Sequence, residues 1–125
     1  MNATQRAHAA YHSASQPIRT HRGVEYEAFA RVTGRMKQHA TRLPTGFQDL
    51  AKALHDNRRL WSALAIDVAD RDNGLPNDLR ARIVYLAEFT RLHSSKVLSS
   101  SASAEPLIEI NMAMMRGLRG TGGAA

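Results

Sequence analysis

The pattern of apolar and polar residues predicts amphipathic helices along most of the chain. It is clearest at residues 47–69, where apolar residues recur every three or four positions and neither glycine nor proline occurs. This spacing places them on one face of a helix. They are Phe47, Leu50, Ala51, Leu54, Trp61, Leu64, Ala65 and Val68, with Ala53 and Leu60 beside them. Because the face is broad, we expect residues 47–69 to form a central helix that several others contact.

Three further long helices are expected on the same grounds. They run from near Thr20 to just before Leu43, from Pro76 to about Leu98, and from about Pro106 to Gly117. Residues 3–14 are rich in alanine and predict a short helix with little bulk to bury. No alternating β pattern and no internal repeat occurs. The sequence therefore predicts an all-α fold, a small helical bundle of four main helices plus a short N-terminal helix.

The length of 125 residues fits one domain. We expect a short N-terminal helix and basic arm at 1–19, the bundle at 20–119 and a flexible glycine-rich tail at 120–125. The turns are rich in helix-ending residues, so we expect Thr45 and Ser103 to cap the helices that follow them. Asn73 or Gly74 should end the central helix in a left-handed conformation. Gly34 lies within a helix, which suggests that another backbone passes close by.

Two polar residues interrupt the apolar face of the central helix. Asn57 lies at its edge, and Arg58 projects near its middle. A buried guanidinium without a partner would cost several kcal/mol. Two interpretations remain open. Arg58 forms an internal ion pair, for which Glu88 is a candidate, or the face is open there and Arg58 and Trp61 contact a partner.

The last helix has apolar side chains around most of its circumference, including Met112, Met114 and Met115. Either two faces of this helix are buried, or one is offered to a partner. Methionine fits both, since it packs adaptably at binding surfaces and also fills gaps in cores.

Charge and composition narrow the classes of protein. The net charge is +6, and residues 1–43 hold seven Arg/Lys against two Glu. A basic segment can bind nucleic acid or an acidic partner, or serve solubility, but aromatic residues are not interleaved with its basic ones and it has no base-reading motif. No apolar run is long enough for a membrane span, and no signal peptide is evident. Cysteine is absent. We therefore expect a cytoplasmic protein without a membrane partner.

Catalytic chemistry is not predicted. No carboxylate pair, Ser-His-Asp arrangement or phosphate-binding glycine loop can be identified. His8 and His12 have a spacing that could share a metal, but no third ligand is placed beside them. The sequence predicts no enzyme, no cofactor and no metal site.

Several segments together resemble the FlaF family of flagellar biosynthesis regulators, over about residues 5–119. These segments are Val24-Glu25-Tyr26, Phe29 to Thr33, Ala53-Leu54, Asn57-Arg58, Leu60-Trp61, Leu64-Ala65, Asp67 to Ala69, Asn73 with Leu75-Pro76, Leu79 to Ala81, Pro106 to Asn111, Met115 and Gly117-Leu118. The resemblance implies a cytoplasmic helical protein that promotes flagellin production and export and engages flagellin as a chaperone or positive regulator. FlbT, which acts on flagellin mRNA in opposition to such proteins, is a second candidate partner.

The residues themselves supply a binding hypothesis. A groove between the central and last helices would hold an amphipathic helix of flagellin, and it would be lined by Asn57, Arg58, Trp61, Met112 and Met115. The alternative is a nucleic-acid-associated regulator that acts on flagellin mRNA through the basic N-terminal third, alone or with FlbT. A third interpretation is a bundle that only dimerises through its methionine-rich helix. The oligomeric state remains open.

Overall fold

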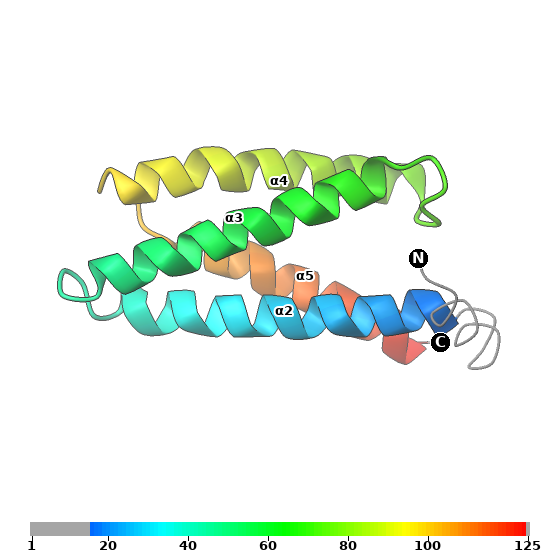
Figure 1. Cartoon of the computed structure of the whole chain (residues 1–125), viewed down its shortest axis with the longest axis horizontal. Helices are drawn as coiled ribbons and strands as arrows, with labels where there is room; N and C mark the ends of the chain where they lie inside the picture. The colour runs from blue at the N-terminus through cyan, green and yellow to red at the C-terminus, as the bar shows by residue number, and fades with distance from the viewer. Residues whose placement is uncertain (1–15, 125) are drawn as a thin grey trace.

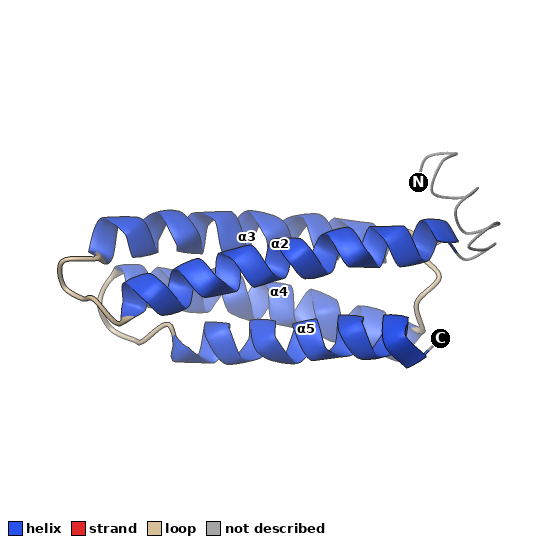
Figure 2. Ribbon diagram, turned by 90° about the horizontal axis from the view of Figure 1, so that it is seen from below, coloured by secondary structure: helices blue, strands red, loops and turns tan. Residues whose placement is uncertain are grey.

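The computed structural model describes residues 16–124, with side chains for 26–118. Its four helices are α2 (Gln16–Ala40), α3 (Phe47–Ala69), α4 (Asn77–Leu98) and α5 (Glu105–Ala124). They run up and down, joined by short turns (Figure 1). Every regular element in residues 16–124 is a helix, as Figure 2 shows. The predicted all-α bundle of four main helices is confirmed, and the predicted helix at residues 3–14 lies outside the described part of the chain.

The four helices surround the core in the order α5, α2, α3, α4. Helix α2 packs closely against both α3 and α5, and α3 packs closely against α4. Helices α4 and α5 pack against each other least, and α3 and α5 share no close backbone packing. α3 and α5 are therefore diagonal partners. In Figure 1, α5 leaves α4 at their connecting turn and crosses behind α2.

The core consists of two apolar clusters along the bundle axis. One lies near the α2–α3 turn and is built around Met36, Leu50 and Leu54. The other is built around Phe29 and Trp61. The predicted inward face of the central helix is largely confirmed. Its fully buried apolar residues are Leu50, Ala53, Leu54, Trp61, Leu64 and Val68.

Two helices extend beyond their predicted limits. Helix α2 begins at Gln16 rather than near Thr20, which is compatible with Pro17 because proline is tolerated in the first turn. Helix α5 continues past Gly117 to Ala124, into the segment expected to be a flexible tail. Glycine costs a helix about 1 kcal/mol relative to alanine but does not forbid it. The boundaries predicted at residues 19 and 119 therefore both fall inside helices.

The predicted caps of α3 are wrong at both ends. Its N-cap is Gly46, without a side-chain hydrogen bond, because the Thr45 hydroxyl donates to the Arg42 carbonyl at 2.7 Å instead. At the other end, Asn73 and Gly74 do not adopt the left-handed conformation. The Arg80 guanidinium reaches over from α4 and donates to the carbonyls of Val68 at 2.6 Å and Asp70 at 2.8 Å. A side chain from another helix thus satisfies the orphan carbonyls.

The last helix begins as predicted. The Ser103 hydroxyl accepts the backbone N–H of Glu105 at 3.3 Å. The N-cap position is Ala104, whose carbonyl accepts the N–H groups of Leu107 and Ile108, so Ser103 binds the first turn from one residue before the N-cap. A further prediction fails at Gly34, which is exposed. A Cβ atom built there would meet nothing within 4 Å. No backbone passes close to Gly34, and its place in the helix has no packing reason.

Candidate functional site

A hydrogen-bond network of four buried side chains lies at the centre of the bundle. The Trp61 indole donates to Oδ1 of Asn111 at 2.9 Å. The amide nitrogen of Asn111 donates to the Thr33 hydroxyl at 3.1 Å and to Oδ1 of Asn57 at 2.8 Å. Each of the four residues is at most 4% exposed. Buried polar groups are expected to be paired in this way, and here the pairing joins α2, α3 and α5.

This network contradicts the predicted groove between the central and last helices. The space between α3 and α5 is the centre of the core, because these two helices are diagonal. Asn57 and Trp61 fill it and contact the protein's own side chains. The sequence held one signal for this. Asn57 lies at the edge of the apolar face of its helix and Asn111 lies among apolar residues of the last helix, which is a typical setting for a buried amide pair.

The predicted pairing of Arg58 with Glu88 is also wrong. Glu88 accepts two hydrogen bonds from Arg91, at 2.6 and 3.1 Å. Arg91 lies one turn further along the same helix, a spacing that brings charged side chains together without any tertiary constraint. The hydrogen bond from Arg91 lowers the pKa of Glu88. Arg58 itself is half-buried on α3.

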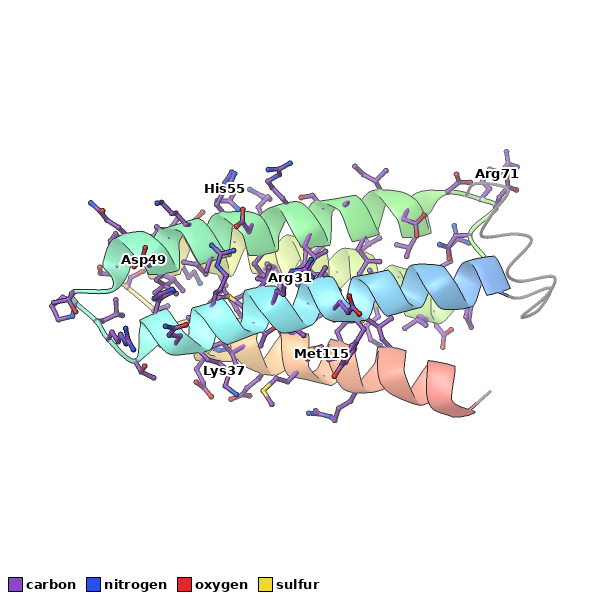
Figure 3. The ribbon with its side chains drawn as sticks, turned by 60° about the horizontal axis from the view of Figure 1, so that its bottom comes forward. Arg31, Lys37, Asp49, His55, Arg71 and Met115 are labelled. Atoms are coloured by element: carbon purple, nitrogen blue, oxygen red, sulfur yellow. The ribbon has the colours of Figure 1, made fainter. Side chains whose placement is uncertain are left out.

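The two predicted methionines of α5 differ in their exposure. Met112 is 37% exposed, and Met115 is half-buried where α5 faces α2 (Figure 3). The structure brings together only some of the five residues predicted to form one site. Asn57 and Trp61 belong to the core, and Met115 packs against the apolar cluster that contains Trp61. Arg58 is half-buried on α3, and Met112 is exposed on α5.

A row of partly buried apolar residues lies along the side where α4 and α5 face each other. Three half-buried residues of α4 and three of α5 line it by helical phase, and we name this set the α4–α5 seam. Its members are Leu79, Leu86, Phe89, Ile110, Met114 and Leu118. The two helices are held together near their connecting turn, where the His93 ring and the Ser103 carbonyl are 2.8 Å apart. Away from that turn α5 diverges from α4 (Figure 1), and these two helices pack together more weakly than any other neighbouring pair.

Exposed residues extend the seam onto the outer surface of α4. Tyr85 and Leu92 are 68% and 50% exposed, and they lie four residues before and three residues after Phe89. This spacing places all three on adjoining parts of one face. Sequence reasoning assigned neither Tyr85 nor Leu92 to a site. The sequence feature that could have identified them is that both are large apolar residues outside the inward stripe of α4.

A shallow depression on the α2–α3 side offers little chemistry. It is lined by Arg35, Ala51, Lys52, His55 and Asp56. Arg35 donates to Asp56 at 2.7 Å. This hydrogen bond, and then the charge of Arg35, lower the pKa of Asp56. A carboxylate held ionised by an arginine is a poor proton donor, so Asp56 is poorly suited to act as an acid catalyst.

The described residues contain neither a cluster of metal-ligating side chains nor a membrane-spanning helix. No group of three or more histidine, aspartate or glutamate side chains there is placed to hold a metal ion. His8 and His12 lie outside them. None of the described helices is both long and apolar enough to cross a bilayer.

The fold and its surface define the class of this protein as a small four-helix bundle with a buried, hydrogen-bonded polar centre and a weakly packed side between α4 and α5. Comparison with protein families then gives a match to the model of flagellar protein FlaF over residues 7–118. The chain belongs to the FlaF family, and is thus a flagellar protein. Comparisons with curated proteins and with solved structures gave no match.

Proposed function

We propose that this protein binds flagellin in the cytoplasm, as a chaperone and positive regulator that promotes flagellin synthesis and export during flagellum organisation. Membership of the FlaF family supports a flagellar role. The observation that carries the proposal is the α4–α5 seam, a row of half-buried apolar side chains along the most weakly packed side of the bundle.

The physical argument rests on what such a surface binds. Flagellin ends are amphipathic helices that pair only on polymerisation, so their apolar faces need a temporary cover before export. A partly open apolar surface between two helices accepts an amphipathic helix through anchors spaced three, four and seven residues apart. Covering the seam removes further apolar area from water, which contributes about 25 cal/mol per Å². The protein and flagellin would then cover each other's apolar faces.

The alternative is a regulator that acts on flagellin mRNA through the basic N-terminal third, alone or with FlbT. Within the described side chains, Arg31, Lys37 and Arg42 are exposed on α2 or just after it, and Figure 3 shows Arg31 and Lys37 on that helix. Phosphate contacts would make affinity fall steeply with salt, whereas apolar binding at the seam would change little. Salt dependence therefore separates the two proposals.

Co-purification of the tagged full chain from flagellated cells tests the proposal. We expect flagellin to be retained after RNase treatment and after washing at raised salt. Loss of flagellin on RNase treatment would favour the mRNA alternative. Recovery of neither flagellin nor its mRNA would overturn both. Self-association without flagellin would identify a protein that only dimerises.

A further inference from the structure

We propose that the α4–α5 seam binds an amphipathic helix carrying a carboxylate beside its apolar stripe, and that this carboxylate pairs with Arg82. The proposal rests on the proposed function for the identity of the natural partner, flagellin. The mode of binding is argued from the seam itself.

The length of the seam fits a helix of about four turns. Leu79 and Leu92 mark the ends of its apolar surface on α4, and at about 1.5 Å per residue they are about 20 Å apart. Across from them, Ile110, Met114 and Leu118 follow one another at every fourth position of α5. These two rows flank the weakly packed side of the bundle, so a third helix laid between them would contact both.

Arg82 supplies the polar specificity of this surface. It lies three residues after Leu79 and four before Leu86, on the same flank of α4, and it is exposed. No hydrogen bond or ion pair to Arg82 occurs among the described side chains. On α5 the exposed positions of the same flank, Ala113 and Gly117, carry no charge. On α4, Asp78 lies one turn before Arg82, and its carboxylate accepts the backbone N–H of Leu79 at 3.0 Å. A carboxylate beside the stripe of the incoming helix would form a charge-assisted hydrogen bond with Arg82, next to apolar surface that excludes water.

Two other occupants fit this charge pattern less well. Residues 1–15 precede the end of α2 that lies where α4 begins (Figure 1), but their sequence contains Arg6, His8 and His12 and no acidic residue. They cannot complement Arg82. A second copy of the chain would offer Arg82 the carboxylate of Asp78 on this flank of α4, but Asp78 already accepts the backbone N–H of Leu79 at 3.0 Å. An acidic helix of another protein is the occupant that charge complementarity selects.

Binding measurements on the full chain test the proposal with two kinds of probe. One is monomeric flagellin. The other is a designed four-turn amphipathic peptide made in three versions, with Glu, Gln or Lys at one position beside its leucine stripe. We expect the Glu peptide to bind about tenfold more tightly than the Gln peptide, in line with a charge-assisted hydrogen bond of ordinary strength. Arg82→Glu should reverse the preference in favour of the Lys peptide.

Matched variants locate the surface. Tyr85→Ser should weaken binding of the Glu peptide by about tenfold, as expected for a contact aromatic at an interface. Ile66→Ser is its control, since Ile66 is 74% exposed on the outer face of α3. Arg59→Glu is the control for Arg82→Glu, because Arg59 is exposed on α3. Neither control should change binding, and circular dichroism should show all four variants folded.

The two kinds of probe separate failure of this inference from failure of the proposed function. Glu-peptide binding that depends on Arg82, without flagellin binding, would support the surface and overturn flagellin as the partner. Flagellin binding unaffected by Arg82→Glu and Tyr85→Ser would retain the function and overturn the seam. Three other results would each overturn the proposal. The first is a loss of peptide binding in Ile66→Ser equal to that in Tyr85→Ser. The second is displacement of the Glu peptide by a synthetic peptide of residues 1–15, and the third is dimerisation of the chain that Tyr85→Ser abolishes.

Discussion

The indole N–H of Trp61 donates a hydrogen bond to Oδ1 of Asn111, 2.9 Å away, across the diagonal of the bundle. The rings of Trp61 and Phe29 also pack edge to face, with their centroids 5.4 Å apart and their planes at 79°. Phe29 lies on α2 and Asn111 on α5, so one tryptophan ties its own helix to two others. Trp61 therefore links α2, α3 and α5 within the core.

Asn111→Leu should destabilise the protein by about 2–4 kcal/mol, because the buried indole N–H and the Asn57 amide each lose their partner at about 1–3 kcal/mol per group. Urea unfolding followed by fluorescence measures this directly, since Trp61 is the only tryptophan. Gln48→Ala, at an exposed amide of α3, serves as the control and should change stability by less than about 0.5 kcal/mol. Equal effects of the two substitutions would contradict the network.

Replacing each of two buried threonines by valine should change the stability of the protein in opposite directions. The Thr33 hydroxyl accepts a hydrogen bond from Asn111, so Thr33→Val should cost about 1 kcal/mol. The Thr90 hydroxyl is buried on α4 without a partner among the described residues. Thr90→Val should therefore stabilise the protein by about 1 kcal/mol, by removing an unpaired polar group. Thermal unfolding of both variants provides the comparison, and destabilisation by Thr90→Val would show that its hydroxyl is paired in solution.

Gly34 and Gly46 should respond oppositely to alanine. Gly34 is exposed within α2 with open space around it, so Gly34→Ala should stabilise the protein by about 1 kcal/mol through helix propensity. A Cβ at Gly46 would lie 2.8 Å from the His39 carbonyl oxygen and 3.3 Å from Cβ of Arg42. Gly46→Ala should therefore cost about 1–3 kcal/mol, as overpacking does. Denaturant midpoints at unchanged slope distinguish the two outcomes.

Acid should weaken the Arg35–Asp56 pair. The hydrogen bond from Arg35 lowers the pKa of Asp56 in the folded state, so the unfolded chain binds more protons as the pH falls toward that lowered value. The contribution is complete above the ordinary aspartate pKa of about 3.9 and is lost below it. Both side chains are about two-fifths exposed, which limits the effect to less than about 1 kcal/mol.

Arg35→Gln tests this pH dependence. Its stability should fall less steeply than that of the unsubstituted protein as the pH is lowered below about 4, a value set by the titration of an unperturbed aspartate. Parallel curves for the two proteins would show that the pair contributes nothing. Arg91→Gln, at an ion pair within one turn of α4, offers a comparison that involves no contact between helices.

Much of the fold could be read from the sequence, and much of the site could not. The spacing of Leu50, Leu54 and Trp61 predicted the inward face of α3, because helical geometry relates sequence positions to directions around one axis. The same geometry does not say which neighbouring helix a side chain meets. Glu88 was therefore only one candidate partner of Arg58, and Trp61 was placed in an open groove, although both predictions depended on how the helices are ordered.

The sequence by itself determined the class of fold, the approximate limits of the helices and which residues face inward, since these follow from short-range periodicity and turn residues. Only the tertiary structure decided that α3 and α5 are diagonal, that Asn57 and Asn111 pair in the core, and that α4 and α5 are left loosely packed. Those outcomes depend on how four amphipathic helices share one core, which involves residues far apart in the chain. The candidate binding surface belongs to this second kind of information, because a seam exists only where two helices meet incompletely.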